Sequence, residues 1–348
     1  MTPQNTGIRL DATRLQQSSL NQLSQPQRHD NSLIVRGANY WVDEARSKAI
    51  PQMLFGKFWH QGEVCILFAD SNLGKSILAV QIADAISKGN GTSPFEVEAA
   101  AQPVIYCDFE LTNKQFEARY SVNYEDHYRF HPNFLRAELN TDPEMMDDAD
   151  NFDETLICDL EESVIVNKAK VVIIDNLTYL RNETEQAKDA LPLMKRLKLL
   201  KNSYDLSILV LAHTPKRDLT QPITRNDLQG SKMLMNFCDS AFTIGESNAH
   251  SGIRYLKQIK QRNTEQVYGE NNVCLCKIAK PHNFLQYEFI NFGKEWEHLT
   301  RKKTDNNRDE DLINKVLDLK AANYSLREIG KQLGITHQRV DRIVRNHY

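Results

Sequence analysis

Residues 69–76 read Ala-Asp-Ser-Asn-Leu-Gly-Lys-Ser, and their types and spacing are suited to binding the phosphate chain of a nucleotide. Backbone N–H groups of such a loop point at a phosphate, and the amino end of a following helix adds its dipole. Lys75 would supply positive charge for the outer phosphates, and Ser76 a hydroxyl ligand for a metal ion. The predicted nucleotide-binding residues are Ala69, Asp70, Ser71, Asn72, Leu73, Gly74, Lys75, Ser76 and Ile77.

The first position of this loop departs from the usual pattern. The pattern G-x-x-x-x-G-K-[ST] begins with glycine, whereas this loop begins with Ala69. Alanine shares many backbone conformations with glycine but reaches positive φ only at a cost. Gly74 keeps the second glycine, where a side chain would obstruct the phosphate. A loop that binds nucleotide without turnover therefore stays open as an alternative, although Lys75 and Ser76 argue against it.

Two carboxylates follow two further apolar runs. Asp175 ends the run at 170–175 in the Walker B arrangement, and would hold Mg²⁺ directly or through water. Asn176 comes next instead of a glutamate, so a catalytic base must come from elsewhere in the chain. Glu110 follows the run at 103–109 and could orient or deprotonate the water that attacks a γ-phosphate. The alternative is that Glu110 only caps the helix that follows it.

A histidine ends the fourth apolar run. His213 comes directly after residues 206–212, and Thr214 follows it. A polar side chain at a strand end can sense the γ-phosphate and relay its loss to neighbouring loops. A lone histidine is as often structural, so both interpretations of His213 stay open.

Four apolar runs must position these side chains. They cover residues 63–69, 103–109, 170–175 and 206–212, and each is apolar nearly throughout, as expected of strands buried on both faces. Helical patterns at 76–87 and 191–202 lie between them. This alternation predicts an α/β fold with a mostly parallel β-sheet flanked by helices. Ligands of such sheets bind at the carboxyl ends of the strands.

Other segments predict the domain organisation. Four later runs alternate in polarity and lie close together, which predicts antiparallel strands appended to the sheet; they are residues 240–245, 254–261, 273–279 and 285–292. We predict a mobile N-terminal tail at 1–31, an ATPase domain at 32–298 with a helix near 43–49 and an acidic surface insertion at 141–154, a linker at 299–310 and a helical domain at 311–348.

Five motifs in this order resemble the RecA/DnaB class of ring ATPases, including RepA-like replicative helicases of plasmids, phages and mobile elements. Residues 74–76 match their GKS, and Glu110 with Gln115, Phe116 and Arg119 resembles their E-x4-Q-[LF]-x2-R motif. The other three are the Walker B region at 171–180, the fourth helicase motif at 228–239, and a K-x-R element at Lys260 and Arg262. The resemblance covers residues 32–292 and implies a RecA-like sheet.

This resemblance implies a Mg²⁺-dependent ATPase that acts on DNA as a helicase or translocase. It implies that Glu110 is the catalytic carboxylate, and that Lys260 and Arg262 reach the ATP of a neighbouring subunit in a homo-oligomer such as a hexameric ring. Positive charge supplied between subunits would stabilise the transition state. The alternative for Lys260 and Arg262 is a solvated edge strand. His213 stands where DnaB proteins usually carry glutamine.

The C-terminal segment has the spacing of a helix-turn-helix. Leu326, Ile329 and Leu333 share one helical face, Gly334 suits the turn, and Thr336 is a good N-cap. With a helix at 311–322 this makes a small all-α domain that resembles the helix-turn-helix of resolvases and many regulators. The candidate DNA-contacting residues are Thr336, His337, Gln338, Arg339, Arg342 and Arg345. The alternative is a helical hairpin that docks on a protein.

Composition excludes several classes of protein. A chain of 348 residues with 41% apolar residues is not a disordered tail, and no run of eighteen apolar residues predicts a membrane span. The absence of an apolar N-terminal run, and cysteines within apolar runs, predict a cytoplasmic protein. The net charge of −3 is uneven: residues 301–348 hold 11 Lys and Arg against 7 Asp and Glu, and residues 1–300 hold 32 against 39. The positive excess thus falls on the predicted DNA-contacting domain.

Two functions remain after these observations. The first is a DNA motor that serves replication or mobilisation of a genetic element. The second is an ATP-switched DNA-binding regulator or loader that unwinds no strands. The helix-turn-helix favours the second more than a generic helicase would, because replicative rings need no sequence readout.

Overall fold

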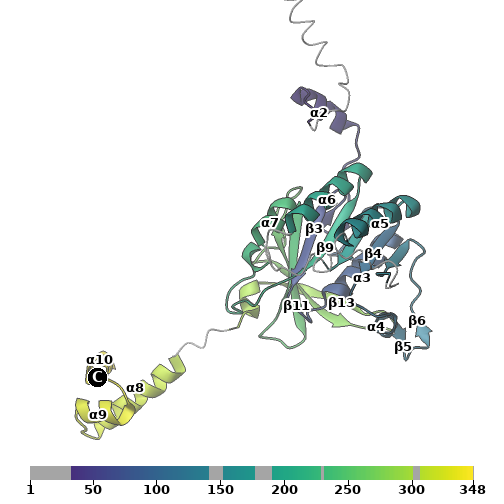
Figure 1. The fold of residues 1–348 in the computed structure, drawn as a ribbon. Helices are drawn as coiled ribbons and strands as arrows, with labels where there is room; N and C mark the ends of the chain where they lie inside the picture. The colour runs from purple at the N-terminus through teal and green to yellow at the C-terminus, as the bar shows by residue number, and fades with distance from the viewer. Residues whose placement is uncertain (1–32, 141–151, 177–189, 229–230, 301–305, 348) are drawn as a thin grey trace, which may run out of the picture. The chain divides into compact units, whose positions relative to one another are not determined.

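The computed structural model describes residues 33–140, 152–176, 190–228, 231–300 and 306–347, and the chain divides into two units, 1–51 and 52–348 (Figure 1). The predicted tail at 1–31 and most of the predicted acidic insertion lie outside the described residues. The first unit contains α2 (Ala38–Arg46). This helix begins and ends earlier than the helix predicted near 43–49.

A nine-stranded sheet forms the frame of the second unit, in the order β13-β12-β11-β10-β3-β9-β8-β4-β7 (Figure 1). The strands from β10 to β7 are parallel neighbours, and β11 to β13 are antiparallel. The parallel strands are β10 (Ser240–Glu246), β3 (Val64–Ala69), β9 (Ser207–His213), β8 (Val171–Asp175), β4 (Val104–Asp108) and β7 (Phe134–Ala137). The antiparallel strands are β11 (Ile253–Lys260), β12 (Val273–Ala279) and β13 (Gln286–Gly293). A mostly parallel sheet with appended antiparallel strands is therefore confirmed.

Two strands of this nine-stranded sheet differ from the sequence prediction. Residues 240–245 were expected to form an antiparallel strand, but β10 pairs in parallel with β3 and only its other edge is antiparallel, to β11. Its first six residues are buried, as in the other central strands. Strand β7 was not predicted, because its four residues are only half-buried and form no apolar run.

Helices cover both faces of the sheet. Alternate residues of β3 belong to different cores: Cys65 and Leu67 pack with α3 (Lys75–Lys88), whereas Ile66 and Phe68 pack with helices on the other face. The other face carries α5 (Phe152–Asn167), α6 (Ala190–Tyr204) and α7 (Ser231–Phe237). Burial on both faces is why the central strands are continuous apolar runs.

Short elements complete this unit. They are α4 (Asn113–Arg119), the 3₁₀ turns η4 (Arg225–Asp227) and η5 (Glu295–His298), and two small antiparallel pairs, β1 (Met53–Phe55) with β2 (Trp59–His60) and β5 (Ser121–Val122) with β6 (Asp126–His127). All six cysteines are unpaired, and only Cys158 is exposed. Among the described residues, no helix has both the length and the apolar character needed to cross a membrane.

Three helices follow at the C-terminal end of the chain. They are α8 (Asn306–Ala321), α9 (Leu326–Leu333) and α10 (His337–His347), and Val316, Ile329 and Val340 form their small core. Ser325 begins α9 with a capping box, and Gly334, at a φ of 68°, ends it. Because α8 begins at residue 306, it takes up part of the segment predicted as a linker.

Candidate nucleotide-binding site

The loop between β3 and α3 turns through the left-handed region twice. Asn72 has a φ of 63° and Gly74 a φ of 90°. The left-handed backbone therefore favours glycine at position 74, and a Cβ atom there would also displace the end of the Ile278 side chain, 2.7 Å away. Ala69, in contrast, is the last residue of β3 and pairs in register with His213. Because residue 69 lies in a strand and not in a left-handed turn, alanine fits this position without strain.

Lys75 lies under this loop. Its Nζ donates to the backbone oxygens of Ala69 and Asp70, at 3.0 and 3.1 Å, and lies 3.2 Å from Nδ1 of His213. Burial lowers the pKa of the ammonium group, and the nearby carboxylate of Asp175 opposes that effect. The lysine is thus a partly desolvated cation that can donate to a phosphate placed at the loop.

Asp175 and Ser76 offer hard oxygen ligands. The Asp175 carboxylate is buried, and it accepts hydrogen bonds from the Tyr106 hydroxyl, at 2.7 Å, and from the Ser76 hydroxyl. Burial raises the pKa of Asp175 to about 6, against the opposing effect of these two hydrogen bonds. A cation would stabilise this carboxylate, and hydroxyl and carboxylate oxygens are ligands that Mg²⁺ prefers. Ser76 and Asp175 therefore fit a Mg²⁺ ion that is shared with a nucleotide.

Glu110 follows β4 and reaches the same end of the sheet. Its Oε1 accepts a hydrogen bond from Asn176 Nδ2, and Nε2 of His213 lies 3.9 Å away. The contact with His213 lowers the pKa of Glu110 most, burial opposes it, and the charge of Lys75 lowers it further. Glu110 does not cap the following helix, because Thr112 occupies the N-cap of α4. The structure thus brings Lys75, Glu110 and His213 together.

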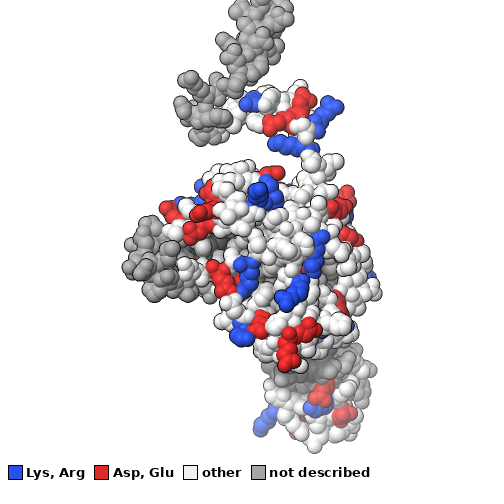
Figure 2. Space-filling model, turned by 90° about the vertical axis from the view of Figure 1, so that its right-hand side faces the viewer, with Lys and Arg blue, Asp and Glu red and all other residues white. Residues whose placement is uncertain are grey.

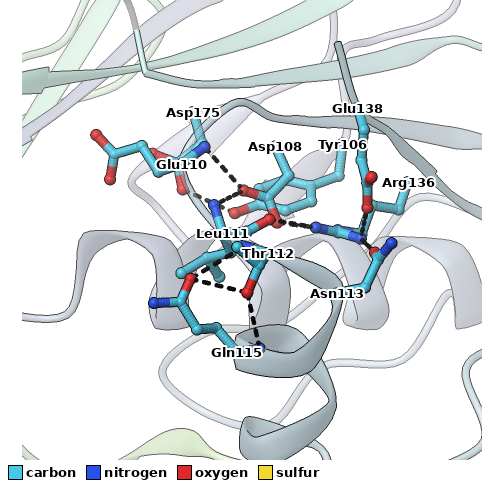
Figure 3. Close-up of polar contacts among 10 residues, drawn as sticks. All are labelled: Tyr106, Asp108, Glu110, Leu111, Thr112, Asn113, Gln115, Arg136, Glu138 and Asp175. Carbon is cyan, nitrogen blue, oxygen red and sulfur yellow. Dashed lines mark hydrogen bonds and ion pairs between the residues drawn. The ribbon is translucent and has the colours of Figure 1, made fainter. Parts of the chain in front are cut away.

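An ion pair between buried Asp108 and half-buried Arg136 holds the turn that carries Glu110 (Figure 3). Asp108 Oδ1 accepts the N–H groups of Glu110 and Leu111, at 3.3 and 3.0 Å, and Oδ2 accepts Nε of Arg136 at 2.9 Å. Arg136 also donates to the Leu111 carbonyl oxygen at 2.8 Å and to Asn113 Oδ1 at 2.6 Å. Figure 3 shows the Glu110 side chain extending away from this pair. We call Asp108 and Arg136 the turn brace.

The turn brace was not predicted from the sequence. Asp108 had a weak signal, because it is a charged residue at the end of an otherwise apolar run. Arg136 had none, because its strand was not predicted. Asn176 was noted only as the residue that replaces a glutamate after Asp175, whereas it contacts both Glu110 and His213.

Two residues of the motif after β4 have structural contacts. Gln115 closes a capping box with Thr112 at the start of α4. The Phe116 ring packs 4.7 Å from that of Tyr120, and the Arg136 guanidinium lies 4.6 Å over its face. Gln115 therefore fixes the start of α4, and Phe116 packs against the arginine that holds the turn of Glu110.

Lys260 and Arg262 lie at the opposite end of the sheet. Lys260 is level with Ala241, near the amino end of the parallel strands, and its Nζ donates to backbone oxygens near the end of α7. Arg262 Nη1 pairs with Asp239 at 3.1 Å. The structure therefore does not bring these two cations to Lys75 within one chain. The fourth helicase motif lies partly outside the described residues, at 229–230, and the Walker B resemblance does so at 177–180.

The candidate DNA-contacting residues lie on or beside α10. The Thr336 hydroxyl accepts the Arg339 N–H at 3.3 Å, and Arg345 pairs with Asp341 at 2.9 Å. All six are exposed: Thr336, His337, Gln338, Arg339, Arg342 and Arg345. Val340 lies between them and is buried in the core of the three helices. Helix α10 thus presents polar and cationic groups to solvent.

Comparison with known families adds one finding. A family model described as an AAA domain matches residues 38–218, just over half of the chain. The match includes Lys75, Glu110, Asp175 and His213, and ends before Lys260 and the three C-terminal helices. No curated protein matches the chain.

Proposed function

We propose, from the premise that this chain belongs to the AAA-domain family, that it is a Mg²⁺-dependent ATPase that acts on DNA as a homo-oligomer. One observation supports the hydrolysis above the others. Lys75, Ser76, Glu110, Asp175 and His213 converge where adjacent parallel strands and the phosphate loop end. Phosphoryl transfer needs little more from a protein than positioning and charge stabilisation at such a point.

Each of these residues has a distinct task in the proposed reaction. The N–H groups at the start of α3, together with Lys75, bind the phosphates. Ser76 and Asp175 hold Mg²⁺, which neutralises charge on the phosphate oxygens when it is bound. Glu110 accepts the proton of the attacking water, and the turn brace keeps its backbone in place. His213 senses whether the outer phosphate is present.

The action on DNA is the finer part of the proposal. The function that we favour is a helicase or translocase that serves replication or mobilisation of a genetic element, because the order of the motifs resembles that of ring ATPases. In such a ring Lys260 and Arg262 would complete the site of a neighbouring copy. Lys260 borders a cavity of about 570 Å³ whose described lining contains no carboxylate, which would suit the approach of a phosphate.

A second function is favoured by a specific feature, the three C-terminal helices with their own small core. We propose that they form a helix-turn-helix domain at 311–348, which binds DNA through α10. The ATPase domain of this proposal covers residues 32–298. On the face drawn in Figure 2, the described basic and acidic side chains of the chain are interspersed, so that face favours no polyanion. An ATP-switched regulator or loader would use α10 to read duplex DNA.

One experiment separates these functions. We expect ATP hydrolysis that needs Mg²⁺ and rises with DNA, in a preparation whose oligomer size is measured with and without nucleotide. Separation of labelled forked DNA would support the motor, and turnover without separation would support the switch. Absence of ATP hydrolysis under all of these conditions would contradict the proposed ATPase.

A further inference from the structure

His213 faces a hydrogen-bond donor on each side of its ring. Lys75 Nζ lies 3.2 Å from Nδ1, and Asn176 Nδ2 lies 3.0 Å from Nε2. The ammonium group of a lysine has only donors, and Asn176 Nδ2 is also a donor, already bonded to Glu110. A neutral imidazole has one acceptor nitrogen, because its other nitrogen carries the proton. His213 therefore cannot accept both hydrogen bonds at once.

The charged form of the ring does not resolve this conflict. An imidazolium has two donors and no acceptor, so both contacts would then join donor to donor. The two neutral tautomers remain, and each satisfies one neighbour. With the proton on Nε2, Nδ1 accepts from Lys75; with the proton on Nδ1, Nε2 accepts from Asn176.

We propose that His213 is a tautomer switch between Lys75 and Asn176, and that a nucleotide phosphate sets the switch by drawing Lys75 to itself. This inference rests on the proposed ATPase function. When Lys75 donates to phosphate, Nδ1 loses its donor and takes up a proton from water, while Nε2 gives one up to water. The net charge of the ring does not change. Nε2 then accepts from Asn176, and the side chains of His213, Asn176 and Glu110 form one continuous hydrogen-bonded chain.

The consequence for the reaction lies at Glu110. While the proton is on Nε2, that N–H points toward the N–H groups of Asn176, and Glu110 Oε1 lies 3.9 Å from Nε2. Once Nε2 is an acceptor, Asn176 can donate to His213 and to Glu110 together, because its amide has two N–H bonds. The amide that already holds Glu110 is then itself fixed by His213 once Lys75 has engaged a phosphate. Asn176 is thus a positioning residue for Glu110.

Burial makes this arrangement effective. Asn176 is 1% exposed and Lys75 is 8% exposed, so water competes poorly for their hydrogen bonds. The backbone of Glu110 is held separately by the turn brace, so the switch has to move only side-chain protons and not the turn. The contact with His213 is also the largest cause of the lowered pKa of Glu110.

The direct test reads the tautomer of His213. Full-length protein with ¹⁵N-labelled histidine is examined by NMR, and the His213 signals are identified by their loss in His213→Gln. Without nucleotide, we expect the proton on Nε2; with Mg-ADP or a non-hydrolysable ATP analogue, we expect it on Nδ1. The same tautomer in both samples, with nucleotide binding verified in each titration, would overturn the proposal.

A second test concerns the positioning of Glu110. Asn176→Ala and the isosteric Asn176→Asp both remove the donor, and we expect kcat to fall about tenfold to a hundredfold while nucleotide affinity stays within about twofold. Asn133→Ala is the matched control, because the amide of the half-buried Asn133 also donates a hydrogen bond, to the backbone oxygen of Ser87, which lies outside the site. Unchanged kcat in both Asn176 variants would overturn the positioning role.

A double-mutant cycle separates this inference from the proposed function. If Asn176 acts through Glu110, then Asn176→Ala should lower kcat little further in a Glu110→Gln background. Effects that multiply would contradict the positioning role while leaving the ATPase intact. Full hydrolysis by Glu110→Gln would instead refute Glu110 as the base, and the tautomer measurement would still be informative because it does not depend on hydrolysis.

Discussion

The carboxyl end of the parallel sheet and helix α10 carry the two groups of residues that the sequence singled out, and the groups are held in different ways. At the sheet, Lys75, His213, Asn176 and Glu110 touch in sequence, and the turn brace supports the last of them. On α10, the candidate side chains are exposed around a small buried core. The first arrangement suits chemistry that needs one fixed geometry. The second suits recognition by contacts that act nearly independently.

The comparison teaches that substitutions should combine differently in the two regions. Residues in one hydrogen-bond network couple strongly, whereas well-separated residues on a surface add nearly independently. If the sheet site is catalytic, single changes should have large effects on turnover that do not multiply. If α10 binds DNA, single changes should have small effects on affinity that do multiply.

Loss of the proposed base should have the largest effect. Glu110→Gln keeps the size of the side chain but cannot accept a proton, so we expect kcat to fall by about 10²- to 10⁴-fold. Nucleotide affinity should be retained, because Lys75 and the loop are unchanged. Steady-state hydrolysis together with equilibrium binding of a fluorescent nucleotide measures both. Glu125→Gln, at an exposed glutamate near β5, is a control that should leave kcat unchanged.

Breaking the turn brace should have the next largest effect. Arg136→Leu leaves the Asp108 carboxylate buried without its ion pair and frees the Leu111 carbonyl oxygen, so the turn under Glu110 loosens. We expect kcat to fall about tenfold to a hundredfold, because small displacements of a catalytic group are costly. We also expect a loss of stability of about 3 kcal/mol, since the remaining charge is buried. Thermal unfolding and kcat should both be measured.

The controls for the brace distinguish its two roles. Arg129→Leu removes a nearby arginine that is not part of the brace and should change neither quantity. If Arg136→Leu lowers the stability but leaves kcat as in the unaltered protein, the brace supports the fold alone and does not position Glu110.

The titration of Asp175 should produce an effect of intermediate size. Its pKa is raised to about 6, so the carboxylate that would bind Mg²⁺ is fully formed only above that pH. Activity should therefore fall by about tenfold per pH unit below pH 6. Protons and Mg²⁺ compete for the same oxygens, so a higher Mg²⁺ concentration should move this limb of the profile to lower pH. A limb that is independent of Mg²⁺ would contradict the assignment of Asp175 as its ligand.

The sequence predicted the central elements better than it predicted their supports. Strands β3, β4, β8 and β9 are buried on both faces, so each is a continuous apolar run that can be recognised locally. Strand β7 is four half-buried residues at the sheet edge, and it becomes a strand only by pairing with β4. The orientation of β10 likewise depends on which strand it joins, which local polarity does not report.

Within the site, too, the residues that follow local patterns were predicted and their supporting residues were not. Lys75, Asp175, Glu110 and His213 were singled out because each follows an apolar run or stands in a recognisable loop. Arg136 could not be found in this way, since its partner Asp108 lies on another strand and their pairing is a product of the folded sheet. The conflict of donors around His213 also became visible only when three strand ends and the phosphate loop were brought together.

The smallest expected effects concern α10. Gln338 and Arg345 are exposed and lie seven residues apart, a rise of about 10 Å along the helix, so they should act independently. We expect Gln338→Ala and Arg345→Ala each to weaken duplex DNA binding by about 1 kcal/mol, or about fivefold, and together by the product of the two. Only Arg345→Ala should also reduce the salt dependence of binding. Basal ATPase activity without DNA should stay the same in all three variants, with Lys320→Ala on α8 as a charge control. Unchanged DNA affinity in the double variant would contradict DNA binding by α10 and would favour docking of the three helices on a protein. The chemistry assigned to the sheet would not be affected by that result.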